Sequence, residues 1–588
     1  NGAVTLGGNE ALNGSALTLG STLSGGAHDL VLNFSSPVTV GGAVITGVRN
    51  LTVQNAATLS GAETTTGAQS YNGAVSLGND ATLTGSGVSF GGAVNGTHAL
   101  TVSGNGTFGG AVGNSSPLSS VHVTGATALN GGTVTTSGAQ AYDGAATLGA
   151  DMTLIGTTLG LAGVAGGNHN LTLKNSAAGT LNGAVSGVNV LTASGSGALT
   201  VKNAISAASV NDSEATTLNG SAVTVTTTGA QTYNGAITLG NDATLTSSGG
   251  GSIAFGSAVD GAQALTINNP GGTTTFSGLV GNATPLTSLT VDGGHLGTIN
   301  GIKVSKTLTL TAISGDITEA GTASIQAGTL TASAGGSIVL GNTGTRSGSG
   351  QPLNQIDAIN GMTAGGGIYV YDAPQAANTL GTLTLSGTIK ANGDATIRTG
   401  RKLVLANGLS INPGANHDII LSAEGTLTPN TGLKDFFVNG TTSANPLHVS
   451  GNNGRWFVYL PFSNTAGIPS LGNLVGGVVA GGVDFETFDA TKGNLPSGFI
   501  LEQGVPKANA TQIFSILFYE VPFQDYRRVT LAISEDTDPS KFCTVNAVCS
   551  SGYDILRKEA ESKRAEGAAA RKVGETLFVI HPVEHAMR

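Results

Sequence analysis

The chain has 588 residues and a formal net charge of −10 at pH 7, and charged residues make up 10% of it, against roughly 25% in an ordinary soluble domain. A hydrophobic content of 39% predicts a folded chain, and the acidic balance disfavours nucleic acid as a partner, because no basic face is available for phosphates. No stretch of 18 uninterrupted apolar residues occurs, so we predict no membrane-spanning helix.

One seven-residue phrase recurs in the first half of the chain, as GAQSYNG at 67–73, GAQAYDG at 138–144 and GAQTYNG at 229–235. Its tyrosines, Tyr71, Tyr142 and Tyr233, are 71 and 91 residues apart. The chain opens on the last two letters of the phrase, so we expect it to be the C-terminal portion of a longer protein. We interpret the phrase as a repeated corner and strand entry, with tyrosines that stack on their equivalents or cover an edge. A ligand site built on the tyrosines is the alternative.

Short strand-like phrases return about every 20 residues. Leu-Thr-Ile at Leu265, Leu-Thr-Val at Leu289 and Leu-Thr-Leu at Leu308 are 24 and 19 residues apart. Alternation of apolar and polar residues indicates a strand with one buried face, and this spacing suits one turn of a solenoid, with glycine and asparagine at its corners. We therefore predict an all-β parallel β-helix over residues 1–435, with roughly twenty turns. An array of β-sandwich domains is the alternative, disfavoured because the only tryptophan, Trp456, lies outside the repeats.

The repeated phrase, the turns rich in glycine, threonine and asparagine, and GNNGRWFVYLP at 451–461 resemble two-partner-secretion exoproteins of the filamentous haemagglutinin and high-molecular-weight adhesin type. The most specific segment contains Arg455, Trp456 and Tyr459 and is similar to a segment found where such repeats end. The resemblance implies a right-handed parallel β-helix that is exported through the periplasm by an outer-membrane transporter partner. It also implies an extracellular, cell-surface role as an adhesin, fibre or biofilm component. The secretion domain of that family is N-terminal and is not in this chain.

The C-terminal part of the sequence has a different composition. Residues 436–530 gather aromatic side chains, which suits a non-repetitive cap over the open end of a solenoid. Residues 531–588 contain the only cysteines, Cys543 and Cys549, and such a pair in an exported protein indicates a disulfide, acting either as a hook or anchor or as a simple stabiliser. Free thiols are the third possibility. Residues 553–573 predict a short terminal helix, followed by a strand at 576–582.

We predict no catalytic residue, cofactor or metal site. The close acidic pair Asp212 and Glu214 has no basic neighbour in the sequence, and the nine histidines show no metal-ligand spacing. We therefore expect a non-enzymatic rod-like adhesin or matrix protein whose glycan or protein receptor is unknown. A self-assembling filament subunit is the alternative, and a polysaccharide-acting β-helix enzyme is a lesser one. Asn-x-Ser/Thr triplets keep glycosylation open.

Overall fold

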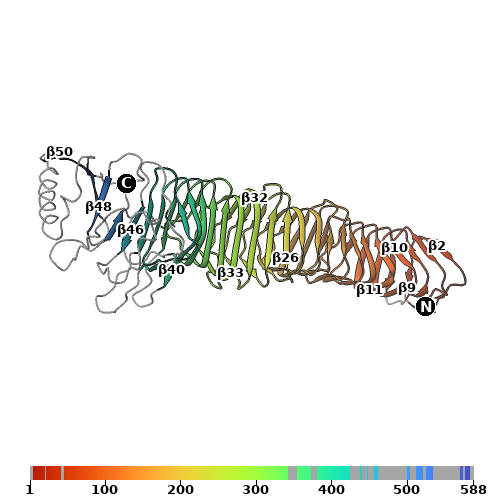
Figure 1. The fold of residues 1–588 in the computed structure, drawn as a ribbon. Helices are drawn as coiled ribbons and strands as arrows, with labels where there is room; N and C mark the ends of the chain where they lie inside the picture. Colours follow the sequence, from red (N-terminus) through yellow and green to blue (C-terminus); the bar gives the residue numbers. More distant parts are fainter. Residues whose placement is uncertain are drawn as a thin grey trace. The chain divides into compact units, whose positions relative to one another are not determined.

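The computed structural model describes residues 4–19, 21–41, 45–341, 354–372 and 381–423, followed by short separate strands and one bridge residue between 437 and 582. All regular elements among these residues are strands, and the parallel strands stack as a β-solenoid of about 20 turns, which confirms the predicted fold class (Figure 1). The chain divides into two compact units, Asn1–Ser305 (unit 1) and Lys306–Arg588 (unit 2). The described residues contain no helix long and apolar enough to cross a membrane.

Each turn of unit 1 has three sides. Strand β11 (Val75–Phe90) runs along all three, because its successive segments pair with three different parts of the preceding turn. Its start pairs in parallel with the first half of β9 (Ala57–Thr65), its middle with the second half of β9, and its end with β10 (Ala68–Tyr71). The next turn repeats this pattern with β12 (Val94–Asn95) and β13 (Ala99–Phe108). Unit 1 is therefore a stack of triangular turns with one parallel ladder on each face.

The repeated phrase occurs on a different face in each of its three copies. Tyr71 pairs with Val53 and Phe90, which defines the first face. Tyr142 pairs with Val123 and Leu161 on the second face. The third face carries the last copy, in a column that pairs Ala193, Asp212, Tyr233 and Phe255. The sequence repeat therefore moves to another face with each copy, although each strand ladder continues from one turn to the next on its own face.

The local sequence explains both the walls and the corners. In β13, Leu100 and Val102 are fully buried while Thr101 between them is half-buried, as the alternation predicts. At the corners, the backbones of successive turns approach closely. A Cβ atom on Gly144, the last residue of the second phrase, would overlap the backbone of Gly125 in the preceding turn. Glycine at this position is therefore required by packing between turns.

Unit 2 continues the parallel pairing in three ladders before the direction changes. Strands β36 (Ile325–Ala334), β38 (Gln355–Ala364) and β40 (Thr382–Ala391) each contribute to two of them. The first half of β40 pairs with β42 (Lys402–Leu405), which pairs with β45 (Phe437–Asn439), and its second half pairs with β43 (Ser410–Asn412). The remaining ladder consists of β35 (Ile317–Thr318), β37 (Ile338–Leu340), β39 (Ile368–Asp372), β41 (Ala395–Thr399), β44 (Ile419–Ala423) and β46 (Trp456–Leu460). Strand β47 (Phe499–Glu502) then pairs with β46 in the antiparallel direction, so the strand that contains Trp456 and Tyr459 is the last parallel strand of this ladder.

The described C-terminal strands form an antiparallel sheet in the order β48 (Gln512–Glu520), β49 (Asp525–Ile533), β51 (Thr576–Pro582) and β50 (Ala570–Val573). Strand β51 has the bounds predicted from the sequence. The predicted helix at 553–573 lies outside the described residues except for its last four, and these form β50. That part of the prediction is wrong, because pairing with β51 overrides the helix propensity of the segment.

Candidate functional site

The repeated phrase forms a short strand between two bends, so its tyrosine lies in the wall of the solenoid. Tyr142 ends β17 (Gln140–Tyr142) and is 1% exposed. Tyr71 and Tyr233 end β10 and β27 (Gln231–Tyr233) and are equally buried. The interpretation of these tyrosines as corner residues is therefore corrected: each one ends a strand beside a corner, glycines occupy the bends themselves, and the alternation that buries the glutamine also buries the tyrosine two residues later.

Two of the tyrosines begin aromatic stacks inside unit 1. The ring centroids of Tyr71 and Phe90 are 5.6 Å apart, and those of Phe90 and Phe108 are 5.2 Å apart. Tyr233 stacks on Phe255 with a centroid distance of 5.4 Å. Each partner lies one turn away, close to the spacing of paired strands. The sequence analysis expected the tyrosines to stack on one another. They do not, because the three copies of the phrase lie on different faces.

The glutamine of the phrase joins two turns through hydrogen bonds inside the core. The side-chain amide of Gln140 donates to the carbonyl of Val134, at 3.0 Å, and to the carbonyl of Ile155 in the next turn, at 2.7 Å. The hydroxyl of Tyr142 donates to Oε1 of Gln140 at 3.1 Å. The hydroxyl of Thr136 donates to the carbonyl of the first glycine of the phrase at 2.9 Å. We call Thr136, Gln140 and Tyr142 the corner clamp.

The other two copies make the same clamp. The equivalent hydrogen bonds use Thr65, Gln69 and Tyr71 in the first copy and Thr227, Gln231 and Tyr233 in the third. The sequence analysis missed the threonines and glutamines, although the spacing Thr-x-Gly-Ala-Gln-x-Tyr is present in all three copies. The clamp uses its polar atoms inside the core, and the phrase is therefore a structural element.

The acidic pair Asp212 and Glu214 lies inside unit 1, with both residues buried. Asp212 accepts hydrogen bonds from the hydroxyl of Thr216, at 2.6 Å, and from the backbone N–H of Glu214, at 2.9 Å. Glu214 accepts from the backbone N–H of Gly195 and the side-chain amide of Asn175. Burial raises the pKa of Asp212 to about 6 and also raises that of Glu214. Asp212 thus bonds within its own turn and Glu214 bonds to other turns, and neither acid faces solvent.

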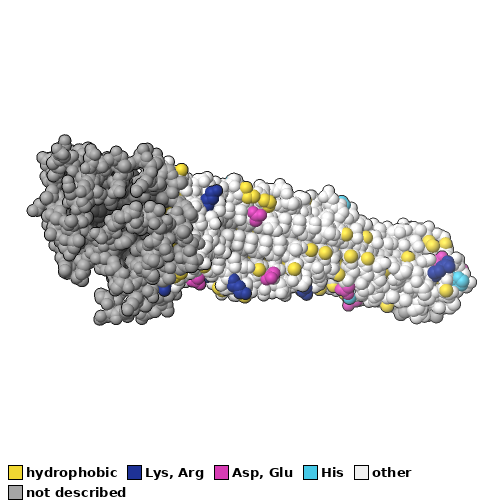
Figure 2. Space-filling model, in the orientation of Figure 1, with side chains coloured by type: hydrophobic (Ala, Val, Ile, Leu, Met, Phe, Trp, Pro, Cys, Tyr) yellow, Lys and Arg dark blue, Asp and Glu magenta, His cyan; other side chains and the backbone are white. Residues whose placement is uncertain are grey.

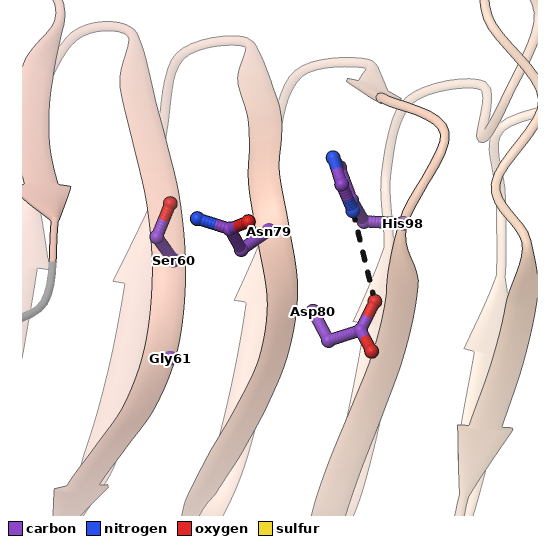
Figure 3. A pocket seen from close by; sticks show the side chains of 5 residues that line it. All are labelled: Ser60, Gly61, Asn79, Asp80 and His98. Carbon is purple, nitrogen blue, oxygen red and sulfur yellow. Dashed lines mark ion pairs between the residues drawn. The ribbon is translucent and has the colours of Figure 1, made fainter.

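One open depression of the described surface has a volume of about 380 Å³ and is lined by Ser60, Gly61, Asn79, Asp80 and His98 (Figure 3). These residues come from three consecutive turns. Asp80 accepts the backbone N–H of the residue after His98 at 2.9 Å, and its carboxylate lies 3.7 Å from Nδ1 of His98. The depression therefore offers amide, carboxylate and imidazole groups to solvent at one corner, whereas Ser60 beside them is buried.

The same aspartate and histidine arrangement occurs elsewhere in the chain. Asp151 lies 3.6 Å from His169 and accepts the N–H of the residue that follows it. In unit 2, Asp394 lies 3.0 Å from His417 and accepts the following N–H in the same way. The histidines that looked scattered in the sequence therefore include three in the same arrangement with an aspartate. We call Asp80–His98 and Asp151–His169 the corner pairs of unit 1. Three or more His, Cys, Asp or Glu side chains do not gather as a metal site anywhere in the described residues.

Unit 2 contains a buried ion pair. The guanidinium of Arg401 donates to both carboxylate oxygens of Asp372, at 2.8 and 3.0 Å, and to Asp357 at 3.0 Å. The side chains of Arg401 and Asp372 are 5% and 0% exposed, whereas that of Asp357 is 71% exposed. Thr399 donates a further hydrogen bond to Asp372 at 2.7 Å. The sequence analysis did not single out these residues, because they are far apart in the chain.

Several predicted site residues cannot be placed. Cys543, Cys549 and Arg455 lie outside the described residues, and for Trp456 and Tyr459 only the strand is described. The surface that Figure 2 shows has few charged side chains, in agreement with the 15 charged residues among the 305 of unit 1.

Comparisons with family models, curated proteins and solved structures found no match to this chain.

Proposed function

We propose that this chain is the rod-forming part of a secreted bacterial adhesin or extracellular fibre of the two-partner-secretion type. It would be exported through the periplasm by an outer-membrane transporter and act at the cell surface without catalysing a reaction. The observation that carries this proposal is the use of polar groups in the parallel solenoid. Its repeated buried polar residues bond to neighbouring turns, and the hollow at Asp80 and His98 is open to solvent.

The corner pairs are the proposed contact points for a receptor. Strands that follow His98 lie on the second face of unit 1, and those that follow His169 lie on the third. A flat partner would therefore meet only some of the corners at once, whereas a network of glycan or protein chains could reach all of them. Weak contacts repeated along a rod add up to strong attachment through avidity.

The enzyme alternative has less support, because glycosidic chemistry needs carboxylates that reach the substrate. Asp212 and Glu214 are 3% and 2% exposed, and both accept hydrogen bonds from other residues of the solenoid. Release of oligosaccharides from acidic polysaccharides by the purified chain would favour this alternative over adhesion.

The adhesion proposal is tested with labelled full-length chain applied to epithelial cells and to matrix-coated surfaces. We expect saturable binding that an excess of unlabelled chain abolishes, and a loss of at least tenfold in apparent affinity for the double variant His98→Ala/His169→Ala. His122→Ala is the matched control, since His122 is also exposed and lies 2.7 Å from Asp143, but within a strand rather than at a corner. Equal binding by both variants would exclude the corner pairs as contacts. Absence of binding to every surface would exclude adhesion.

A further inference from the structure

One buried acid in unit 1 has no polar partner. Glu63 belongs to β9 and faces the interior, where it pairs in the ladder with Ile45 of the preceding turn and Leu83 of the next. It is 0% exposed, and neither of its carboxylate oxygens accepts a hydrogen bond from another residue. The other buried acids of unit 1, Asp212 and Glu214, do accept such bonds. Glu63 is therefore the acid whose burial is least compensated.

The internal repeat shows what the fold has at the same position elsewhere. The residue eight positions before the tyrosine is Glu63 in the first copy, Val134 in the second and Val225 in the third. In all three copies its carbonyl accepts a hydrogen bond from the glutamine of the corner clamp. The backbone geometry is thus the same, and only the buried side chain changes from valine to a carboxylic acid.

We propose that Glu63 makes its turn a proton-dependent weak point of unit 1, closed while the acid is neutral and opened when it ionises. An ionised carboxylate in an apolar interior without hydrogen-bond donors is strongly unfavourable, so ionisation favours any state that lets water reach it. Nearest-neighbour packing holds a solenoid together, so loss of one turn separates the turns on either side of it.

Few groups near Glu63 could compensate its charge. From β10, Tyr71 faces it, and the proximity of the two raises the pKa of this tyrosine further above the value set by burial. The hydroxyl of Tyr71 donates to Gln69, and the Gln69 amide donates to backbone carbonyls. The paired residues in β7 (Ile45–Val48) and β11 are Ile45 and Leu83, which do not titrate. The described residues therefore place no cation against this acid.

Burial raises the pKa of Glu63 to about 8, against 4.5 for the free side chain. Because the folded turn holds its proton more tightly than the open turn, the acid favours closure fully below pH 4.5. This contribution is lost as the pH rises towards 8. Each pH unit in that window shifts the opening equilibrium about tenfold, since one unit of pKa corresponds to a factor of ten.

The inference does not depend on the adhesion proposal and is tested on the full chain by amide hydrogen exchange between pH 5 and 8.5, with rates corrected to protection factors at each pH. We expect protection in β9 and β10 to fall about a hundredfold or more over this range. Protection in β16 (Thr133–Thr135) and β17, the matched segment that contains Val134, should stay constant. A pH-independent protection of β9 and β10 would overturn the proposal.

Three variants separate the effect of the acid from that of the surrounding structure. Glu63→Val introduces the residue of the other two copies and should remove the pH dependence, as should the neutral isostere Glu63→Gln. The reverse change, Val134→Glu, should transfer the pH dependence to β16 and β17. If Glu63→Val and Glu63→Gln both kept the wild-type pH profile, another group would control the opening, and the proposal would be wrong.

Discussion

Unit 1 and unit 2 compensate polar groups buried at their corners with different chemistry. Unit 1 uses a neutral clamp in which the amide of Gln140 bonds to carbonyls of two turns and to the hydroxyl of Tyr142. Unit 2 uses the ion pair of Arg401 and Asp372. A neutral clamp removes no charge from water, so the same sequence can recur at three corners without the free-energy cost of burying a charge. A buried ion pair needs both partners in place, because either one alone is a buried charge.

The comparison predicts that the ion pair is the more sensitive of the two. Replacement Arg401→Met leaves Asp372 buried without its guanidinium, so we expect unit 2 to lose about 3–5 kcal/mol of unfolding free energy. Denaturant unfolding followed by hydrogen exchange in β39 and β41 measures this loss. Asp357→Asn is the control, since this partner is mostly exposed and should contribute less than about 1 kcal/mol. Equal effects of the two changes would show that the buried pair has no special role.

A smaller loss is expected from the neutral clamp. Gln140→Leu leaves the carbonyls of Val134 and Ile155 and the hydroxyl of Tyr142 without this partner, which we expect to cost about 2–3 kcal/mol. Tyr142→Phe removes a single hydroxyl and should cost about 1 kcal/mol. Thermal and denaturant unfolding of both variants give the comparison. A larger effect for Tyr142→Phe would mean that the tyrosine hydroxyl, and not the glutamine amide, makes the main contribution of the clamp.

The close approach of successive turns in unit 1 leads to a further prediction about stability. Gly144→Ala introduces a Cβ that overlaps the backbone of Gly125, and we expect a loss of about 1–3 kcal/mol from the forced shift. Gly160→Ala is the matched control, because a Cβ there meets only the carbonyl of Gln140, at 3.8 Å. Melting temperatures of the two variants measure the difference. An equal loss in Gly160→Ala would show that overlap with Gly125 is not the cause, because the lower backbone entropy of the unfolded chain would by itself stabilise the variant.

The smallest effect is expected at an exposed ion pair. Arg49 donates to Asp29 at 2.6 and 2.8 Å and, by hydrogen bonding, lowers the pKa of Asp29 to about 2 from 3.8. Its stabilising contribution is therefore present above pH 4 and is lost as the pH falls towards 2. Arg49→Ala should reduce the melting temperature only slightly at pH 7 and by less at pH 2, where about half of Asp29 is protonated. A reduction as large at pH 2 as at pH 7, or one that high salt left unchanged, would contradict this assignment.

The recurrence of the phrase and the spacing of Leu265, Leu289 and Leu308 were enough to predict a parallel solenoid and its approximate number of turns. Both follow from local periodicity, which a single turn already contains. The same reasoning placed the tyrosines at corners, because it did not follow the alternation from Gln140 to Tyr142. It also extended a helix to Val573, where strand pairing decides the structure.

The sequence by itself therefore determined the repeating turn, its buried alternation and the low charge of its surface, since each depends on neighbours within about 20 residues. Only the tertiary structure decided what meets across turns. Three features depend on how many sides of the solenoid lie between two residues along the chain. They are the face that each copy of the phrase occupies, the pairing of Arg401 with Asp372, and the isolation of Glu63. Small differences in the number of residues per turn add up along the stack. A local sequence pattern therefore does not predict which residues meet several turns later.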